Sequence, residues 1–412
     1  MHALSICFIA LVIVILLLKL YLNYRQHAAI KSNINEVPES FAKRIKLYDH
    51  QKAAYYNLAK LKLNNFEEIF SSILLLAFTL GGGIQLINNY FSNLTTSPLT
   101  LGVVVIGVYS VLNSVLTMPF GLYATFGIEQ EYGFNKTTVR LFIADLVKGI
   151  IVAAIIGIPL LYLVLWLMSI LGSTWWLWVW VVLVAFNLSL LVIYPIFIAP
   201  LFNKFKPLED VVLRNRINKL LDKCGFKSRG LFVMDGSKRS SHGNAYFTGI
   251  GKSKRIVFFD TLMKQLNHDE TEAVLAHELG HFKKKHILKQ MIISFGVTLV
   301  ILYILSLLIN KPALYTSLGV STISTSNGLI LFSALLGLFS FPFAPISSFF
   351  SRKNEFEADS FASCYSDKRH LISGLVKMYR DNASTLTPDS LYVRFYYSHP
   401  PASVRIAHLE QL

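Results

Sequence analysis

The chain is dominated by long apolar runs separated by short polar breaks. A helix needs about 20 mostly apolar residues to cross a hydrocarbon layer of about 30 Å. Seven runs are long enough: Ala3–Leu22, Phe66–Ile87, Leu99–Tyr123, Leu141–Leu171, Trp175–Leu201, Ile287–Ile309 and Gly328–Phe350. We therefore predict an α-helical polytopic membrane protein with seven transmembrane helices. Only Met1 and His2 precede the first run, so we expect it to be a retained anchor rather than a signal peptide.

Lysine and arginine are distributed unevenly over the polar breaks, and this predicts an orientation. Residues 23–64 carry eight of them, whereas 88–98 carry none and 310–326 carry only Lys311. Cytoplasmic loops are enriched in these residues, so the 23–64 loop is expected in the cytoplasm. Alternation of the spans then places the N-terminus outside and every large polar segment on the cytoplasmic side.

The same pattern divides the chain into four parts. Residues 1–201 hold membrane helices 1 to 5, 202–286 form a small α/β cytoplasmic domain, 287–350 hold helices 6 and 7, and 351–412 form a helical C-terminal part. Inside 202–286, hydrophobic periodicity predicts two helices and three strands. Their expected positions are a helix over Leu208–Cys224, a strand at Gly230–Met234, a hairpin of Ala245–Ile250 and Arg255–Phe259, and a helix from Asn267.

Composition limits the class of protein. Hydrophobic residues make up 53% of the chain and charged residues 15%, and the mean hydropathy is +0.50, which excludes a disordered or purely soluble protein. The formal charge of +15 suits either nucleic acid or an anionic membrane surface. The basic residues gather beside expected helix ends and no nucleic-acid-binding motif accompanies them, so we expect membrane lipid and no nucleic acid as a partner. The three cysteines lie far apart, so a metal site must use histidines and carboxylates.

One short motif carries the strongest chemical signal. His277 and His281 lie four residues apart within a helical pattern, and Glu278 lies beside them. This H-E-x-x-H spacing lets two imidazoles on one helix face share a Zn²⁺, while the glutamate accepts a proton from the metal-bound water. The alternative is an ordinary amphipathic helix whose histidines are satisfied within the fold.

A catalytic zinc also needs a third protein ligand and an open position for water. Glu355 and Asp359 lie on one face of a helix expected to open at Asn354, so one can bind zinc while the other holds a ligand imidazole. The sixth and seventh spans form a hairpin between the two motifs. That hairpin would return the Glu355 helix beside His277 and His281.

Four further polar residues have simpler expected roles. His286 follows three lysines at the foot of the sixth span and is expected to be an interfacial residue rather than a ligand. Glu357 points away from the face of Glu355 and is expected to be a solvated carboxylate. Asp145 and Lys148 lie within the fourth apolar run, where they either line a water-filled interior or pair with each other one turn apart.

The wider pattern resembles the type I CAAX prenyl protease family of integral-membrane zinc metalloendopeptidases, with a bacterial member as one alternative. The residues that carry the resemblance are H-E-L-G-H, E-F-E-A-D after a membrane hairpin, and Tyr397-Ser-His-Pro-Pro401 followed by Arg405. More agreement comes from four segments along the chain: His50-Gln-Lys-Ala-Ala54, Gly133-Phe-Asn-Lys136, Ala199-Pro-Leu-Phe-Asn203 and Asn244-Ala-Tyr246. The match spans nearly the whole sequence.

The resemblance implies one zinc ion per chain, bound by three residues: His277, His281 and Glu355. Glu278 would be the general base and Asp359 would hold a ligand histidine. His399 and Arg405 would support the tetrahedral intermediate, whose oxyanion a cation or donor stabilises. From their positions alone, a surface turn and a helix-start cation are the simpler interpretations of those two residues. The resemblance also implies that the seven helices enclose a chamber.

Three residues at the start of the predicted hairpin suit substrate binding: Asn244, Ala245 and Tyr246. An extended peptide can add to an edge strand through main-chain hydrogen bonds, which would present its scissile amide to zinc with little side-chain selectivity. A purely structural hairpin predicts the same residues.

We therefore predict a monomeric, zinc-dependent membrane endopeptidase that cleaves near the C-terminus of proteins, with prenylated CAAX proteins as candidate substrates. Its active site is expected toward the cytoplasm, in a bacterial inner membrane or an endoplasmic reticulum membrane. One alternative is a quality-control zinc protease that clips misfolded membrane proteins with the same residues. Another is a seven-span transporter or scaffold with a structural metal. A structural zinc usually has four protein ligands, so a set of three favours a protease.

Overall fold

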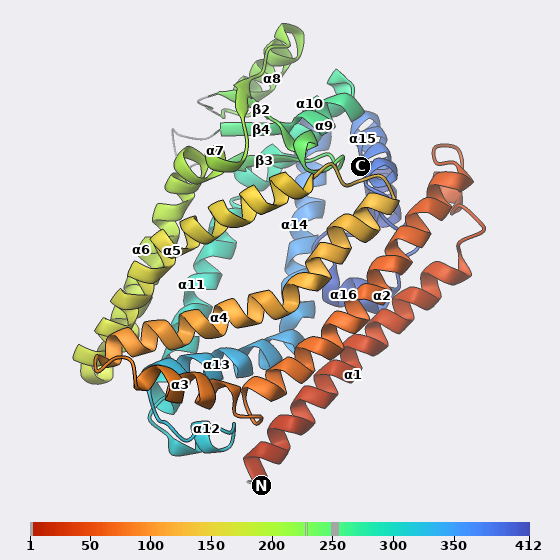
Figure 1. The fold of residues 1–412 in the computed structure, drawn as a ribbon. Coiled ribbons are helices and arrows are strands. Elements are labelled where there is room, and N and C mark those ends of the chain that lie inside the picture. The colour runs from red at the N-terminus through yellow and green to blue at the C-terminus, as the bar shows by residue number, and fades with distance from the viewer. Residues whose placement is uncertain (1–2, 227, 229, 249–254) are drawn as a thin grey trace.

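A computed structural model describes residues 3–226, 228, 230–248 and 255–412 of the chain. Long helices run through most of the molecule, and a small sheet with its covering helices lies at one end (Figure 1). The N-terminal part contains α1 (Ala3–Ser32), α2 (Leu47–Phe78), α3 (Gly83–Ser92), α4 (Pro98–Leu122), α5 (Val139–Ile170), α6 (Trp175–Ile193) and α7 (Ala199–Phe202). The middle part contains β1 (Phe205–Pro207), α8 (Val211–Lys223), β2 (Leu231–Met234), β3 (Ala245–Thr248), β4 (Arg255–Phe259), α9 (Asp260–Gln265) and α10 (His268–Lys283). The C-terminal part contains α11 (His286–Leu308), α12 (Pro312–Thr316), α13 (Thr325–Ser340), α14 (Ala344–Tyr365), α15 (Lys368–Asp381), α16 (Ser390–Tyr396) and α17 (Ala402–Gln411).

The apolar runs form membrane-spanning helices. Over the described residues, six helices are long and apolar enough to cross a membrane, and α2 with α3 is a bent pair that makes a seventh if counted as one span. The chain is therefore an α-helical polytopic membrane protein, as predicted. The second span is not straight, because α2 ends at Phe78 and α3 leaves at an angle of 47°. Gly82 lies in this break with φ of 79°, a left-handed conformation that glycine adopts readily.

Two other expected boundaries are wrong. The predicted 23–64 loop is mostly helical, because α1 continues to Ser32 and α2 already begins at Leu47. Asn354 does not open a helix either, because it lies in the middle of α14, which follows α13 after a short turn at Phe341–Phe343. The prolines of this region occupy first-turn positions, where a missing N–H does not interrupt a helix. One helix therefore runs from the membrane directly into the part of the molecule that contains the small sheet.

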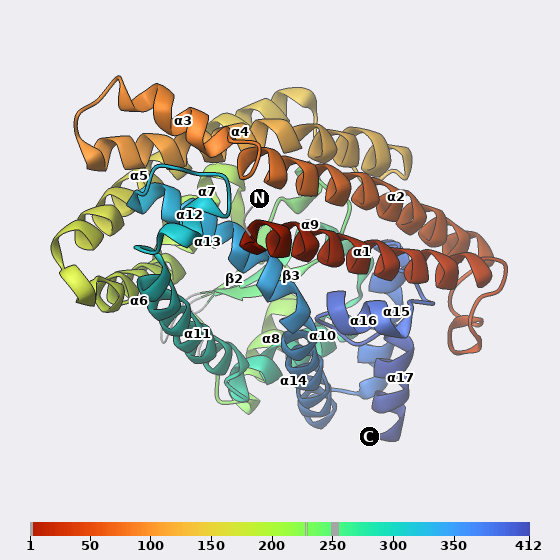
Figure 2. The ribbon, with the colours of Figure 1, turned by 90° about the horizontal axis from the view of Figure 1, so that it is seen from below.

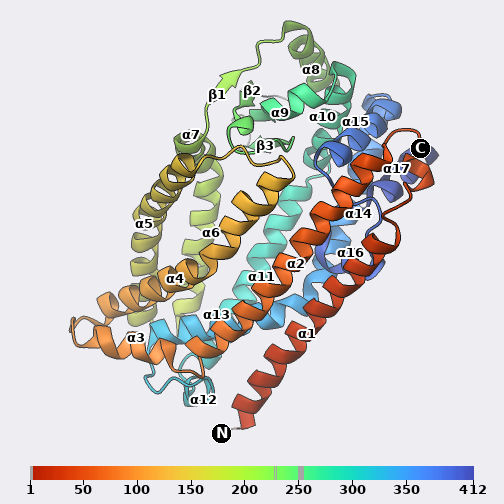
Figure 3. The ribbon, with the colours of Figure 1, turned by 45° about the vertical axis from the view of Figure 1, so that its right-hand side comes forward.

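The long helices follow one another around a ring (Figures 2 and 3). Each helix contacts the next one in the series α1, α2, α4, α5, α6 and α11. Helix α16 contacts both α14 and α1. Helix α13 packs against α4 and also contacts α1 and α5. Large apolar side chains such as Ile155, Ile292 and Phe349 are exposed on these helices, which is the surface expected where lipid replaces water.

The small sheet has the strand order β1-β2-β4-β3, so β3 lies at an edge. Strands β2 and β4 are parallel, whereas β3 pairs antiparallel with β4 from Ala245↔Phe258 to Thr248↔Arg255. The hairpin and its free edge therefore agree with the sequence prediction. Its predicted Gly251-Lys-Ser-Lys254 turn lies outside the described residues.

Helices α10 and α14 cross with their backbones almost in contact, and this crossing builds the site. A Cβ added at Gly280 would lie 2.9 Å from Ala358 Cα. A side chain at position 280 would therefore clash with the backbone of α14. The crossing is held by an apolar core beneath the sheet, which includes Ile217, Phe258 and Leu275.

Candidate metal centre

Two helices supply the three predicted zinc ligands. Helix α10 begins with a capping box in which Asn267 and Glu270 satisfy each other's backbone N–H groups. Its third and fourth turns carry His277 and His281, and α14 carries Glu355 across from them. One ligand atom of each of the three side chains lies within 4.8 Å of the others. The structure therefore brings together the residues that the sequence motifs predict.

The distances suit a shared cation. His277 Nε2 lies 3.2 Å from His281 Nε2 and 3.4 Å from Glu355 Oε2, and His281 Nε2 lies 3.3 Å from Glu355 Oε1. Glu355 Oε2 is buried and makes no well-aligned hydrogen bond among the described residues. Two imidazole nitrogens and a carboxylate that converge in this way form a donor set of the kind that binds zinc, so the residues fit a metal ion.

The electrostatics at His277 also favour a positive charge. Burial and the nearby guanidinium of Arg405 lower the pKa of this imidazole, but hydrogen bonds with the carboxylates of Asp359 and Glu355 more than offset them and raise the pKa to about 9. A metal ion must therefore displace a proton at this imidazole at neutral pH.

Asp359 and Arg405 form a buried layer behind the ligands. Asp359 Oδ1 lies 2.8 Å from His277 Nδ1, on the side of the ring away from Glu355. Arg405 Nε donates to Asp359 Oδ2 at 2.9 Å, and Arg405 Nη1 lies 3.3 Å from Glu355 Oε2. Asp359 thus contacts His277, the arrangement that the resemblance implied after spacing had left Glu355 and Asp359 interchangeable, and the Arg405 guanidinium is largely occupied by the two carboxylates.

A cleft of about 350 Å³ opens onto these residues. It is lined by the predicted base Glu278 and by His399, which is exposed and has its Nε2 atom 3.4 Å from Glu355 Oε1. Glu278 is only half-buried, so its carboxylate is accessible to a substrate or to water. The cleft can therefore admit a peptide bond next to the three ligands.

The structure places two of the three predicted substrate-binding residues in the cleft. Asn244 and Ala245 line the cleft, and the carbonyl of Asn244 accepts a hydrogen bond from Phe259 N at 2.9 Å. Tyr246 is not among the residues that line it, and its hydroxyl lies 4.0 Å from Met234 Sδ. Ala245 and Tyr246 are successive residues of β3, so their side chains point to opposite faces, whereas Asn244 precedes the strand.

Helix α15 and the residue that follows it supply cleft residues that sequence reasoning missed. Asn382 lines the cleft and accepts a hydrogen bond from Gly243 N at 3.1 Å, which fixes the backbone just before Asn244. Tyr379 lines the same wall. Neither residue stands in a motif, and the approach of α15 to the edge strand is a long-range contact without a local signal.

Two pairs of polar residues differ from their expected roles. His286 is not interfacial, because it is buried and its two nitrogens contact His281 and Glu357. Glu357 is consequently not simply a solvated carboxylate. Asp145 and Lys148 do not pair with each other: Asp145 accepts hydrogen bonds from Arg239 at 2.8 and 3.0 Å, and Lys148 Nζ donates to the Leu201 carbonyl at 2.8 Å.

Comparison with known proteins covers the whole chain. Residues 26–204 match the family described as CAAX prenyl protease N-terminal, five membrane helices, and residues 207–412 match peptidase family M48. The chain is 33% identical over 418 residues to CAAX prenyl protease 1 of Saccharomyces cerevisiae, covering 95% of this chain and 91% of the relative. It is 30% identical over 444 residues to the CAAX prenyl protease 1 homolog of Homo sapiens, covering 95% and 92%. The crystal structure of S. mikatae Ste24p aligns over 100% of both chains with a TM-score of 0.93 and 32% identity.

Proposed function

Because this chain belongs to peptidase family M48, with the N-terminal membrane region of the CAAX prenyl proteases, and is a multi-span membrane metalloendopeptidase, we propose that it uses zinc to cleave proteins near their C-terminus. The observation that carries the proposal is the convergence of His277, His281 and Glu355 beside an edge strand. A bound zinc would polarise the scissile carbonyl and lower the pKa of water.

The surrounding residues then have separate tasks. Glu278, on the cleft wall, takes a proton from the attacking water and delivers it to the leaving amine. His399 is exposed in the same cleft and can donate a hydrogen bond to the developing oxyanion. Arg405 supports that charge from behind the ligands, where it also holds Asp359 and Glu355 in place.

Substrate is bound chiefly through its backbone. An extended peptide pairs with the free edge of β3 at Asn244 and Ala245, which directs its scissile amide toward the metal ligands. The names of the yeast and human relatives support CAAX proteins as the substrate class. A prenyl group would add about 0.8 kcal/mol per buried CH₂ if it occupied an apolar surface at the membrane.

The proposed enzyme works as a monomer among membrane lipids, with its zinc site toward the cytoplasm. The excess of lysine and arginine in residues 23–64 supports this orientation. An endoplasmic reticulum membrane and a bacterial inner membrane are equally consistent with this orientation.

The test compares one peptide in three forms: farnesylated on its cysteine, unmodified, and fused at both ends to folded domains. If the ring of helices encloses a chamber that admits only a flexible tail, the doubly blocked form resists cleavage. We expect the unmodified peptide to be cut slowly, because backbone pairing with β3 needs no lipid. Equal cleavage rates for the farnesylated and unmodified peptides would show that the enzyme does not recognise the prenyl group. Rapid cleavage of the doubly blocked form would favour a quality-control protease over one that processes C-terminal tails.

Metal analysis of the purified protein tests the zinc itself. We expect one zinc per chain, and a clear loss in His277→Ala. Full zinc occupancy in that variant would contradict the ligand assignment.

A further inference from the structure

The two ligand histidines are held through different partners at their Nδ1 atoms. His277 Nδ1 contacts the buried carboxylate of Asp359 directly, at 2.8 Å. His281 Nδ1 instead lies 3.0 Å from Nδ1 of a third imidazole, that of His286. His286 is 3% exposed and belongs to the first turn of α11, outside the H-E-x-x-H helix.

The position of the metal-binding atom determines where each proton must be. His281 Nε2 faces Glu355, so this is the nitrogen that would bind the metal. A neutral imidazole has one N–H and one lone pair, which leaves the proton of His281 on Nδ1. That N–H can donate to His286 Nδ1 only if the proton of His286 is on its Nε2 atom. Nε2 of His286 lies 3.2 Å from Glu357 Oε2, a carboxylate that accepts hydrogen bonds.

We infer that His286 and Glu357 are positioning residues for the metal ligand His281. Glu357 accepts the Nε2 proton of His286 and so fixes its tautomer. His286 in turn accepts the Nδ1 proton of His281 and holds that ring with Nε2 toward the metal. The inference deepens the proposed zinc site and rests on it.

The backbone between His281 and His286 explains how their two imidazoles come into contact. In an uninterrupted helix, residues five apart point about 140° away from each other and do not meet. Here α10 ends and α11 begins between them, and Lys285 at the junction has φ of 59°. Such a left-handed conformation is uncommon for a residue with a side chain. This junction turns His286 back against His281.

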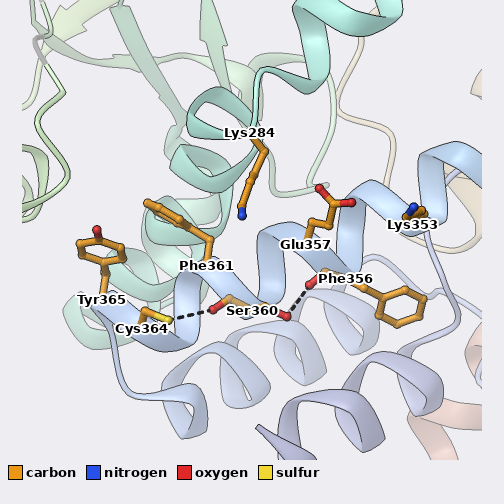
Figure 4. A pocket seen from close by; sticks show the side chains of 8 residues that line it. All are labelled: Lys284, Lys353, Phe356, Glu357, Ser360, Phe361, Cys364 and Tyr365. Atoms are coloured by element: carbon orange, nitrogen blue, oxygen red, sulfur yellow. Dashed lines mark hydrogen bonds between the residues drawn. The ribbon is translucent and has the colours of Figure 1, made fainter.

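Glu357 lies at the accessible end of the chain of contacts. Its side chain is 37% exposed and shares a pocket with Lys284, on the outer side of α14 (Figure 4). Asp359, by comparison, is completely buried. One ligand histidine is thus held entirely within the core, and the other through a carboxylate that solvent can reach. A change at Glu357 can therefore be made at the surface without disturbing the core.

The experiment measures zinc affinity and the visible spectrum of the Co²⁺-substituted full-length protein in detergent. His286→Phe keeps a ring of similar size but has no nitrogen, whereas His286→Gln keeps a hydrogen-bond acceptor. We expect His286→Phe to weaken zinc binding by about 10–100-fold and to shift the Co²⁺ absorption, because the tautomer and orientation of a ligand are lost. His286→Gln should recover most of the affinity, and Glu357→Leu, which removes the hydrogen-bond acceptor, should weaken binding by up to about tenfold. His268→Phe, at an exposed histidine paired with Asp210, is the matched control.

Unchanged affinity and spectrum in His286→Phe would show that His286 only fills space, which overturns the inference. Unchanged values in Glu357→Leu would equally overturn the two-step arrangement. Because Glu357 is partly exposed, this second variant remains informative if His286→Phe fails to fold, which a thermal unfolding scan of the metal-free protein would reveal. If the proposed zinc site were wrong, Glu355→Ala would retain full zinc affinity. This variant therefore distinguishes failure of the zinc site from failure of the inference about His286 and Glu357.

Discussion

Gly280→Ala is expected to destroy the metal centre without touching a ligand. Ordinarily, glycine to alanine within a helix stabilises a protein by roughly 0.5–1 kcal/mol, because alanine loses less backbone entropy on folding. At Gly280 the added methyl would lie 2.9 Å from Ala358 Cα, 3.1 Å from its carbonyl oxygen and 3.2 Å from its Cβ. The obstacle is backbone of α14, which cannot rotate away as a flexible side chain would.

The size of the effect follows from these distances. Ordinary van der Waals contact begins near 3.4 Å, so α10 and α14 must separate by about 0.5 Å, the difference between 3.4 and 2.9 Å. Overpacking of this kind costs about 1–3 kcal/mol, which exceeds the gain in helix propensity. His277 and His281 move with α10 while Glu355 moves with α14. Zinc coordination tolerates deviations of only about 0.2 Å, so the ligand set no longer fits one ion.

The assay combines zinc content with thermal unfolding of the purified protein. Gly280→Ala should lose most of its zinc and unfold at a lower temperature. Gly296→Ala is the matched control, because Gly296 also lies within a helix and an added Cβ there would have no neighbour within 4 Å. If Gly280→Ala kept its zinc and became more stable, the close crossing of the two helices would not be what positions the ligands.

Three further outcomes are expected. Glu278→Gln should keep its zinc but lose turnover, because the ligands remain while the proton acceptor is gone; substantial activity would contradict its role as the base. Burial raises the pKa of Glu270, but hydrogen bonds from Lys377, Ser373 and the Asn267 backbone together outweigh burial and lower this pKa. Its contribution to stability is therefore complete above the unfolded pKa of about 4.3 and is lost as pH falls through the lower folded value, so the acid-induced drop in melting temperature should be smaller in Glu270→Gln. Single cysteines at three exposed positions should react with an impermeant reagent from one side of the membrane, and a cysteine at Asn93 only from the other; a split among the three would reject the proposed orientation. The three positions are Lys46, Lys206 and Glu410.

The membrane architecture was predictable because it depends on local properties of the chain. An apolar run of sufficient length must form a helix in lipid wherever it lies in the fold, because no water is present to satisfy its backbone. The H-E-x-x-H spacing is equally local, since helical periodicity alone places His277 and His281 on one face. The third ligand was also accessible to sequence reasoning, because a hairpin of two spans returns the chain to the membrane face it left.

Details that depend on long-range packing could not be predicted in this way. The outward-facing position of Glu357 on α14 indicated a solvated carboxylate, and only the packing of the α10–α11 junction against α14 pairs it with His286. Asp145 looked like a partner for Lys148 one turn away, yet Arg239, 94 residues further along, reaches it from the protease domain. Ala245 and Tyr246 are neighbours in β3 and point to opposite faces, but which of them faces the cleft depends on the side of β3 that the metal helices cover.

The roles of these residues thus divide according to the range of the interaction that creates them. Helix formation in the apolar runs and the spacing of the ligand histidines result from neighbours within a few residues, and these features can be recognised in the printed sequence. The orientation of each ligand ring depends on hydrogen bonds between atoms that the chain brings together from α10, α11, α14 and α17. Those contacts require the close approach of Gly280 to Ala358. The two residues are 78 positions apart, so no local pattern in the sequence indicates that they meet. The need for a glycine becomes apparent only once the two helices have packed.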